Sequence, residues 1–319
     1  MKRCLVTGAA GFVGSHLCEA LLARGESVLG VDCFTDYYDP GRKRTNLSGA
    51  LAAGLEFRRL DLTRDELDPA LNGVDVVYHL AAQPGVRPSW SEDFDVYARR
   101  NIVATQRLLE ATLRAGAPRF VLASSSTVYG DLGNKPARET DRLAPVSPYG
   151  LTKVACEELL GVYRRVHGLS AVSLRYFTVY GPRQRPEMAF ASFIRANLAG
   201  RPLRVFGDGR QSRDFTYVAD AVAATLAAAE HGTEFAYNVS GGSSATVLEA
   251  IAVIERLTGR PTLVRFSPPA RGDAYRTKAD LTVARRDLGY TAQVVLAEGL
   301  ALQVQAALQE RTELAEAVA

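Results

Sequence analysis

Tyr149 and Lys153 have side chains suited to acid–base chemistry, and they stand four positions apart in a segment with a helical pattern, Pro148–His167. Residues four apart on a helix lie on one face, a turn from each other. A free phenol titrates at about pH 10 and is a poor base at neutral pH, but a nearby ammonium group favours the phenolate. The pair could therefore remove a proton from a hydroxyl, although the same spacing also occurs on solvated helix faces.

A turn with the glycines Gly8, Gly11 and Gly14 joins an apolar run, Cys4–Thr7, to a helical pattern, Gly14–Arg24. Glycines at such a turn let backbone amides approach a pyrophosphate, whose charge the helix N-terminus stabilises. An ordinary tight turn has a similar pattern, so the neighbouring features decide between the two interpretations.

Asp32 is one of these features, because it ends the second apolar run, Ser27–Val31. Its carboxylate can accept hydrogen bonds from the ribose hydroxyls of adenosine and would repel a 2′-phosphate, and no arginine directly follows it. The third apolar run ends at Asp61–Leu62, which could meet adenine. The fourth ends at Leu80–Ala82, whose small residues would lie where the chain passes under the cofactor. We therefore expect NAD rather than NADP.

Strands and helices alternate through the first half of the sequence. Short β-branched runs predict strands at Cys4–Thr7, Ser27–Val31, Glu56–Leu60, Val74–Leu80, Arg119–Ala123 and Ala171–Arg175. Helical patterns stand between them at Gly14–Arg24, Val96–Ala115 and Pro148–His167. This alternation predicts an α/β fold with a Rossmann-type doubly wound parallel sheet.

The pattern changes after Gly181. Short segments and isolated helices predict a smaller C-terminal α/β lobe, with helices near Phe190–Ala199, Thr246–Leu257 and Leu296–Gln309. We expect residues 1–180 to form an NAD-binding Rossmann domain, with return segments around 213–240. Residues 181–319 would then form mainly a substrate-binding lobe.

Composition excludes several classes of protein. The net charge of the 319 residues is only +3, and no basic run is interleaved with aromatics, so we expect no nucleic-acid partner. The sequence contains no apolar stretch of about 18 residues, so it predicts no membrane span. No CxxC spacing occurs among the four cysteines, which are Cys4, Cys18, Cys33 and Cys156. We therefore expect buried thiols and no metal site. We also expect a soluble, cytoplasmic protein.

Three motifs together carry a resemblance to a known superfamily. The glycines have GxxGxxG spacing, Tyr149–Lys153 reads YxxxK, and a serine-rich run spans Ala123–Gly130. The chain resembles the extended short-chain dehydrogenase/reductases, in the branch that modifies nucleotide sugars. The pattern of that branch continues at Arg175–Phe177, Tyr180–Arg183 and Arg213–Phe215. The resemblance therefore covers essentially the whole chain.

The resemblance implies roles for individual residues. Tyr149 would be the base, Ser125 would hydrogen-bond the same sugar oxygen, and Lys153 would also hold the nicotinamide ribose. We expect His79 and Tyr129 to pack rather than react. The cofactor-binding residues would be Gly8, Gly11, Phe12, Val13, Gly14, Asp32, Asp61, Leu62, Leu80, Ala81, Ala82, Tyr149, Lys153, Tyr176 and Asn101, the last in a structural role.

Thr127 bears on which reaction follows. Members of this branch share oxidation at C4 of the hexose, and its dehydratases and decarboxylases typically carry an acidic residue two positions after the catalytic Ser or Thr. Here that position is Thr127. The resemblance therefore implies a 4-epimerase, in which the 4-keto sugar takes hydride back on its other face.

The segment Phe177–Phe190 resembles UDP-glucuronate 4-epimerases. That resemblance places Thr178 and Arg185 beside the C6 carboxylate of a UDP-sugar, since a guanidinium can bind a carboxylate through two bonds. A solvated surface turn is the competing interpretation of Arg185. Other candidates for sugar or phosphate contacts are Arg87, Ser125, Ser126, Thr127, Arg213, Arg271 and Arg276.

Alternatives stay open at this point. A UDP-glucose/galactose 4-epimerase would use the same catalytic residues, while a 4,6-dehydratase, a UDP-glucuronate decarboxylase or a non-catalytic NAD-sensing protein fits less well. Relatives commonly form homodimers through the helices that correspond to Val96–Ala115 and Pro148–His167. The apolar residues that suit such a dimer could equally face the sheet: Ile102, Leu109, Leu113, Leu159, Leu160 and Tyr163.

Overall fold

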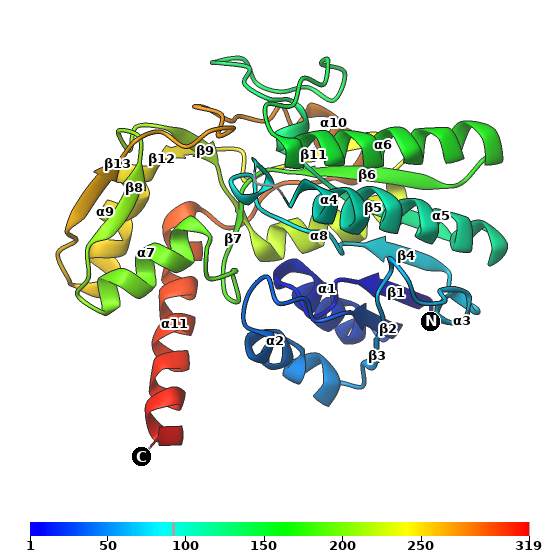
Figure 1. Ribbon diagram of the computed structural model, residues 1–319, viewed down its shortest axis with the longest axis horizontal. Coiled ribbons are helices and arrows are strands. Elements are labelled where there is room, and N and C mark those ends of the chain that lie inside the picture. Colours follow the sequence, from blue (N-terminus) through cyan, green and yellow to red (C-terminus); the bar gives the residue numbers. More distant parts are fainter. Residues whose placement is uncertain (91–92, 319) are drawn as a thin grey trace.

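A seven-stranded sheet forms the centre of the computed structural model, which describes residues 1–90 and 93–318 (Figure 1). Its strand order is β11-β6-β5-β4-β1-β2-β3, and every neighbouring pair is parallel. The strands are β1 Arg3–Thr7, β2 Ser27–Asp32, β3 Glu56–Arg59, β4 Val76–His79, β5 Arg119–Ser125, β6 Ala171–Tyr176 and β11 Ala236–Val239. The α/β prediction is thereby confirmed.

Helices cover both faces of this sheet (Figure 1). Two apolar clusters lie between helices and strands, one under α1, α2 and α8 and the other under α3, α5 and α6. The helices are α1 Phe12–Ala23, α2 Pro40–Ala52, α3 Asp68–Leu71, α4 Phe94–Tyr97, α5 Ala104–Arg114, α6 Pro148–His167 and α8 Val218–His231. Strands buried on both faces explain why their sequences read as continuous apolar runs.

Two helical predictions need correction. The segment Val96–Ala115 is not one α-helix, because a π-helical stretch, Ala98–Val103, separates α4 from α5. Helix α2 was not predicted, since its polar sequence gives little apolar periodicity. Its signal was local: Asp39 caps the helix by accepting a bond from the Gly41 N–H at 2.8 Å, and Pro40 occupies a first-turn position.

The rest of the chain forms short ladders and helices beside the sheet. Three two-stranded ladders pair β7 with β10, β9 with β12, and β8 with β13. The elements are β7 Val179–Tyr180, α7 Ala189–Leu198, β8 Leu203–Phe206, β9 Ser212–Asp214, β10 Thr216–Tyr217, β12 Ser244–Thr246, α9 Val247–Thr258, β13 Val264–Ser267, α10 Thr282–Leu288 and α11 Leu296–Val318. Because α8 and β11 return to the sheet, the two parts are interleaved in sequence.

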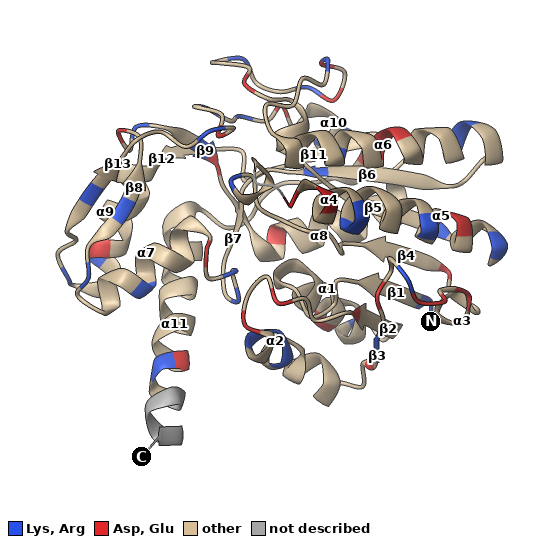
Figure 2. Cartoon of the chain, viewed as in Figure 1, with Lys and Arg blue, Asp and Glu red and all other residues tan. Residues whose placement is uncertain are grey.

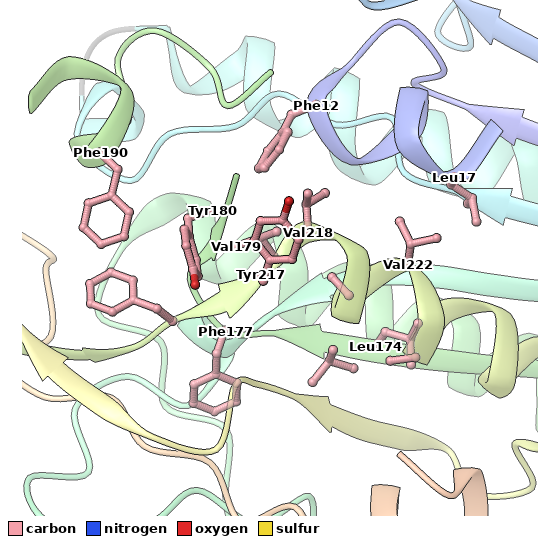
Figure 3. Close-up of a cluster of buried hydrophobic side chains, with 14 of the residues drawn as sticks. Phe12, Leu17, Leu174, Phe177, Val179, Tyr180, Phe190, Tyr217, Val218 and Val222 are labelled. Atoms are coloured by element: carbon pink, nitrogen blue, oxygen red, sulfur yellow. The ribbon is translucent and has the colours of Figure 1, made fainter. Parts of the chain in front are cut away.

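An aromatic cluster joins the two parts (Figure 3). Phe12 from the start of α1, Tyr180 from β7 and Phe190 from α7 all belong to it. The ring centres of Tyr180 and Phe190 are 5.4 Å apart, with the rings nearly perpendicular, and those of Tyr180 and Tyr217 are 5.7 Å apart. Edge-to-face contacts of this kind stabilise a core beyond simple burial. The same aromatic packing therefore supports both the glycine turn and the smaller ladders.

Charged residues are spread over the elements of both parts rather than gathered on one (Figure 2). No helix among the described residues combines the length and apolar character needed to cross a bilayer. Nor do residues 1–90 and 93–318 bring together three or more His, Cys, Asp or Glu side chains that could hold a metal ion. All four cysteines are free, and Cys33 is only half-buried, which corrects its expected full burial.

Candidate active site

A cavity of about 400 Å³ lies where β1, β2, β4, β5 and β6 end. Since β1 stands between β2 and β4, the chain direction across the sheet reverses here, which is where doubly wound folds bind ligands. The cavity is lined by these residues expected from the sequence: Gly8, Gly11, Phe12, Val13, Gly14, Asp32, Asp61, Leu62, Leu80, Ala81, Ala82, Ser125, Ser126, Thr127, Tyr149, Lys153, Tyr176, Thr178 and Arg185.

Tyr149 and Lys153 reach the cavity from the first turns of α6. Ser147 caps this helix by accepting a bond from the Gly150 N–H at 3.0 Å, which fixes where the helix begins. The Lys153 ammonium lies 6.0 Å from the centre of the Tyr149 ring and donates to the carbonyl of Ala123 at 2.8 Å. The cation and the phenol therefore share one wall of the cavity.

Ser125 is the last residue of β5 and lines the same cavity. Its Oγ accepts bonds from the backbone N–H of Thr127 at 3.2 Å and from the Thr127 hydroxyl at 3.0 Å. Ser125 thus caps the single turn Ser126–Val128, and its own hydroxyl hydrogen is left for another acceptor. Thr127 has no acidic group, so no carboxylate is supplied at that position.

The glycine turn leaves no space for side chains. A Cβ on Gly14 would lie 2.1 Å from the carbonyl oxygen of Gly8, and one on Gly8 would lie 2.8 Å from the backbone nitrogen of Ala81. Gly8 also has a φ of +71°, which other residues rarely adopt. Phe12 buries its ring in the core, so its contribution to the cavity is at the backbone. The result is a cradle of peptide groups at the N-terminus of α1.

Asp32 lies at the end of β2 and lines the cavity. One carboxylate oxygen accepts a bond from the Phe34 N–H at 2.8 Å. Burial raises the pKa of Asp32, opposed by that bond and by the nearby Lys43 ammonium. Lys43 in α2 was not predicted; its Nζ donates to the carbonyl and the hydroxyl of Thr35, both at 2.9 Å.

Asn101 lies outside the lining of the cavity and holds the chain around it. Its side-chain oxygen accepts a bond from the Gln83 N–H at 2.6 Å, and its amide donates to Thr152 Oγ1 at 2.9 Å. The side chain therefore ties the segment after β4 to α6. Its position in the π-helical stretch fits the frequent occurrence of such irregularities at functional sites.

His79 and Tyr129 are buried, as expected. His79 lies between the hydroxyls of Thr7 at 2.8 Å and Thr105 at 2.9 Å, and burial lowers its pKa to about 3. Tyr129 donates to the side-chain oxygen of Asn238 at 2.7 Å. Neither lines the cavity.

Arg185 and Thr178 enter the cavity from the segment that follows β6. Arg185 Nε donates to Glu187 Oε1 at 2.7 Å, and only 24% of the Arg185 side chain is exposed. Burial alone would lower the pKa of Arg185, but the Glu187 carboxylate outweighs it and raises that pKa. The structure thus places Arg185 in the cavity wall and not in a solvated surface turn.

A second cavity beside β8 and β13 is lined by Arg213. Arg213 donates to the carbonyls of Ser212 at 2.9 Å and Tyr275 at 3.1 Å, and burial lowers its pKa. At its edge, Arg87 lies 4.0 Å from the ring centre of Phe206 and donates to Asp273 at 3.0 Å.

Two predicted phosphate contacts are not brought to either cavity. Arg271 is exposed, and Arg276 donates to the side chain of Asn134. Neither arginine lines the first or the second cavity, so their contact with phosphate stays a prediction.

Sequence reasoning missed several lining residues, which lie mainly in the loop before α2, after β4 and after β6. The cap at the start of α2 was a usable signal for the residues of the loop before α2, because it fixes where that loop ends. The missed residues include Thr35, Tyr37, Tyr38, Lys43, Pro84, Gly85, Val86, Arg100, Ser124, Phe177, Val179 and Met188.

Comparison with known proteins agrees with this geometry. The sequence matches the model of the NAD dependent epimerase/dehydratase family over residues 4–240. It is 44% identical over 304 residues to a Bacillus subtilis protein named an uncharacterized UDP-glucose epimerase, covering 94% of this chain and 96% of that protein. It is 35% identical over 303 residues to UDP-glucuronate 4-epimerase of Thermodesulfobacterium geofontis, covering 93% of each.

The fold is also close to a solved structure. The crystal structure of UDP-glucuronic acid 4-epimerase from Bacillus cereus, in complex with UDP-glucuronic acid and NAD, superposes with a TM-score of 0.93. The sequences are 40% identical, and 97% of this chain and 99% of that chain are covered. Together with the cradle and the Tyr149–Lys153 pair, these matches show that the chain belongs to the NAD dependent epimerase/dehydratase family.

Proposed function

We propose that the protein is an isomerase that interconverts UDP-glucuronate and UDP-galacturonate by NAD-dependent epimerisation at C4. The observation that carries this proposal is that Ser125, Tyr149 and Lys153 share one cavity with Arg185 and with the glycine cradle. The named activities of the relatives from Thermodesulfobacterium geofontis and Bacillus cereus support it.

The residues present fit a dinucleotide. The cradle that a Cβ would fill offers peptide N–H groups to a pyrophosphate, and the Asp32 carboxylate can accept bonds from a ribose diol. Asp61 and Leu62 line the cavity near Asp32 and would face adenine. When bound, NAD supplies a hydride acceptor and donor, so that C4 is oxidised and reduced again without net redox change.

The chain's own residues manage the proton. Tyr149 removes the proton from the C4 hydroxyl and returns it after the 4-keto sugar has turned its other face. Lys153 holds its ammonium 6.0 Å from the centre of the Tyr149 ring, and Ser125 donates to the same sugar oxygen with the hydrogen that its capping role leaves free. Thr127 cannot act as a general acid at neutral pH, so elimination of water lacks its partner.

Arg185 and Thr178 would hold the C6 carboxylate. The 4-keto uronate is a β-keto acid and loses CO₂ when the bond from C5 to the carboxylate aligns with the carbonyl π system. A guanidinium that binds the carboxylate through two bonds can hold that bond out of alignment. Arg213 and Arg87, near the second cavity, are the candidates for the diphosphate.

UDP-glucose is the second candidate substrate, favoured by the name of the Bacillus subtilis relative. Proton NMR of the purified protein with UDP-glucuronate, and separately with UDP-glucose, distinguishes the two. Conversion of the uronate to UDP-galacturonate without pentose supports the proposal. Conversion of the glucose sample alone would remove Arg185 from its role and leave the second candidate.

We also propose a cytoplasmic homodimer with one NAD-binding domain, residues 1–180 with the return segments, and one substrate lobe in each subunit. Leu109, Leu160 and Tyr163 are buried against the sheet and do not form the interface. The same helices instead expose Leu151, Val162, Val166 and Val103, at 53%, 41%, 68% and 43%. Light scattering coupled to size-exclusion chromatography would give twice the mass of 34.5 kDa.

A further inference from the structure

Glu187 contacts Arg185 from outside the cavity. Its Oε1 accepts a bond from Arg185 Nε at 2.7 Å, and 39% of its side chain is exposed. Arg185 lines the cavity, whereas Glu187 does not. The carboxylate therefore contacts a guanidinium that lines the cavity, although it does not line the cavity itself.

The guanidinium keeps its other donors for a ligand. Arginine has five N–H donors in a rigid fork, and its two terminal nitrogens can bind a carboxylate through parallel bonds. Glu187 uses the Nε donor only. Among residues 1–90 and 93–318, no hydrogen bond to the terminal nitrogens of Arg185 is found. The end of the fork is thus available to the cavity that Thr178 and Tyr149 also line.

The backbone before Arg185 is anchored to α1. His16 Nε2 lies 3.0 Å from the carbonyl oxygen of Pro182, and Arg183 donates to Glu19 at 2.7 Å. Arg183 has a φ of +63°, a left-handed conformation that costs a residue with a side chain energy. The two contacts to α1 hold the segment in that conformation.

Gln184 anchors the same segment from the other direction. Its side-chain oxygen accepts bonds from the Ala191 N–H and from the side-chain amide of Gln303, both at 2.9 Å. Gln184 and Gln303 are both buried. With the backbone fixed on both sides, the freedom left to Arg185 is in its long side chain, and Glu187 is the group that restricts it.

We propose that Glu187 is a positioning residue that orients the terminal nitrogens of Arg185 toward the carboxylate of a uronate substrate, and so sets the preference for UDP-glucuronate over UDP-glucose. This inference rests on the proposed function. The long arginine side chain has rotamer entropy to lose on binding, and the ion pair restricts that freedom before the substrate binds. Pre-organisation of this kind raises affinity without adding a contact to the ligand.

The test compares Glu187→Ala and Glu187→Gln with the wild-type enzyme, using KM and kcat for both nucleotide sugars. In Glu187→Ala we expect KM for UDP-glucuronate to rise about tenfold, with kcat and the kinetics on UDP-glucose nearly unchanged. Glu187→Gln keeps an oxygen that can accept the Nε bond, so its KM should lie closer to wild type. The pentose formed by decarboxylation should increase in Glu187→Ala, because a looser fork lets the carboxylate rotate.

Glu234→Gln is the matched control. Glu234 also pairs with an arginine, Arg286 at 3.2 Å, on an exposed surface away from both cavities. We expect no change in either KM. The melting temperature of each variant shows whether it is folded, and the exposed position of Glu187 makes both substitutions compatible with the fold.

Three outcomes would overturn the inference. A lower KM for UDP-glucuronate in Glu187→Ala would mean that Glu187 competes with the substrate carboxylate. Equal effects on both nucleotide sugars would indicate a merely structural role, and an unchanged KM would show that Arg185 needs no orientation. If the wild-type enzyme does not convert UDP-glucuronate, the proposed function itself fails, which is a different result from normal conversion with unaffected variants.

Discussion

Lys153 lies one helical turn after Tyr149 on α6, with its ammonium 6.0 Å from the phenol ring and bonded to the Ala123 carbonyl at the end region of β5. The cation is therefore fixed by the strand that also carries Ser125. Movement of α6 relative to β5 would change all three groups together. One helix and one strand of the buried sheet therefore hold Tyr149, Lys153 and Ser125 in place.

Tyr149→Phe removes the phenolic oxygen and keeps the ring. We expect turnover to fall by about 10²- to 10⁴-fold, since general base catalysis contributes factors of this size, with substrate binding largely retained. Proton NMR of UDP-galacturonate formation measures the loss. Tyr163→Phe is the control, because Tyr163 lies on the same helix but contacts Glu110 outside the cavity. Full activity of Tyr149→Phe would exclude the catalytic role.

Asp32→Asn should weaken NAD retention and stabilise the cofactor-free protein. Burial raises the pKa of the Asp32 carboxyl above its unfolded value, so ionisation at neutral pH destabilises the fold, and this cost shrinks as pH falls from the folded pKa to the unfolded pKa. The asparagine amide removes this cost of ionisation. It also removes one carboxylate oxygen that could accept a hydrogen bond from the ribose. Thermal melting without NAD and fluorescence titration with NAD measure the two effects. Asp36→Asn, in the same loop and exposed, should change neither.

Glu157→Gln should destabilise the fold by about 3–5 kcal/mol, because it leaves the buried Arg175 without its counter-charge. The two side chains pair at 2.7 Å, with exposures of 1% and 4%. Urea unfolding monitored by circular dichroism gives the free energy of unfolding. Asp68→Asn breaks the exposed pair with Arg114 and should have little effect. Similar losses in the two variants would contradict the importance of burial.

His79 should make stability depend on pH. The unfolded chain protonates this histidine at about pH 6.5, but the folded protein does so only at about pH 3. Between these values the unfolded state binds more protons, so stability falls as pH falls, by up to about 1.4 kcal/mol per pH unit from this group. His79→Gln should reduce the slope of unfolding free energy against pH, whereas His231→Gln, at an exposed histidine, should leave it unchanged.

Elements with a strong pattern could be predicted from the sequence. The six predicted strands lie in the sheet with end shifts of one or two residues, and α6 has the predicted bounds, Pro148–His167. Its serine cap, first-turn proline and C-terminal glycine are local signals that do not depend on the rest of the fold. The π-helical stretch gave no such signal, because it depends on Asn101 reaching Gln83 and Thr152.

Site residues that belong to sequence motifs could be predicted. Those that tertiary packing brings to the site could not. The glycine turn follows β1, and Asp32 and Ser125 end β2 and β5, so their meeting at one sheet edge follows from a parallel sheet, whereas Tyr149 and Lys153 reach the site from α6. Lys43 lies near Asp32 because α2 packs against α1, and periodicity did not predict α2. Whether Arg271 or Arg276 meets a phosphate depends on the path of a loop, which residue spacing cannot fix.

The bond between Gln184 and Gln303 has a consequence for how the protein is made. The two residues are 119 positions apart, and Gln303 lies in α11. Because α11 is synthesised last among the described helices, the bond to Gln184 can form only after almost all of the chain has been made. The segment that carries Arg185 therefore gains its last anchor late in synthesis.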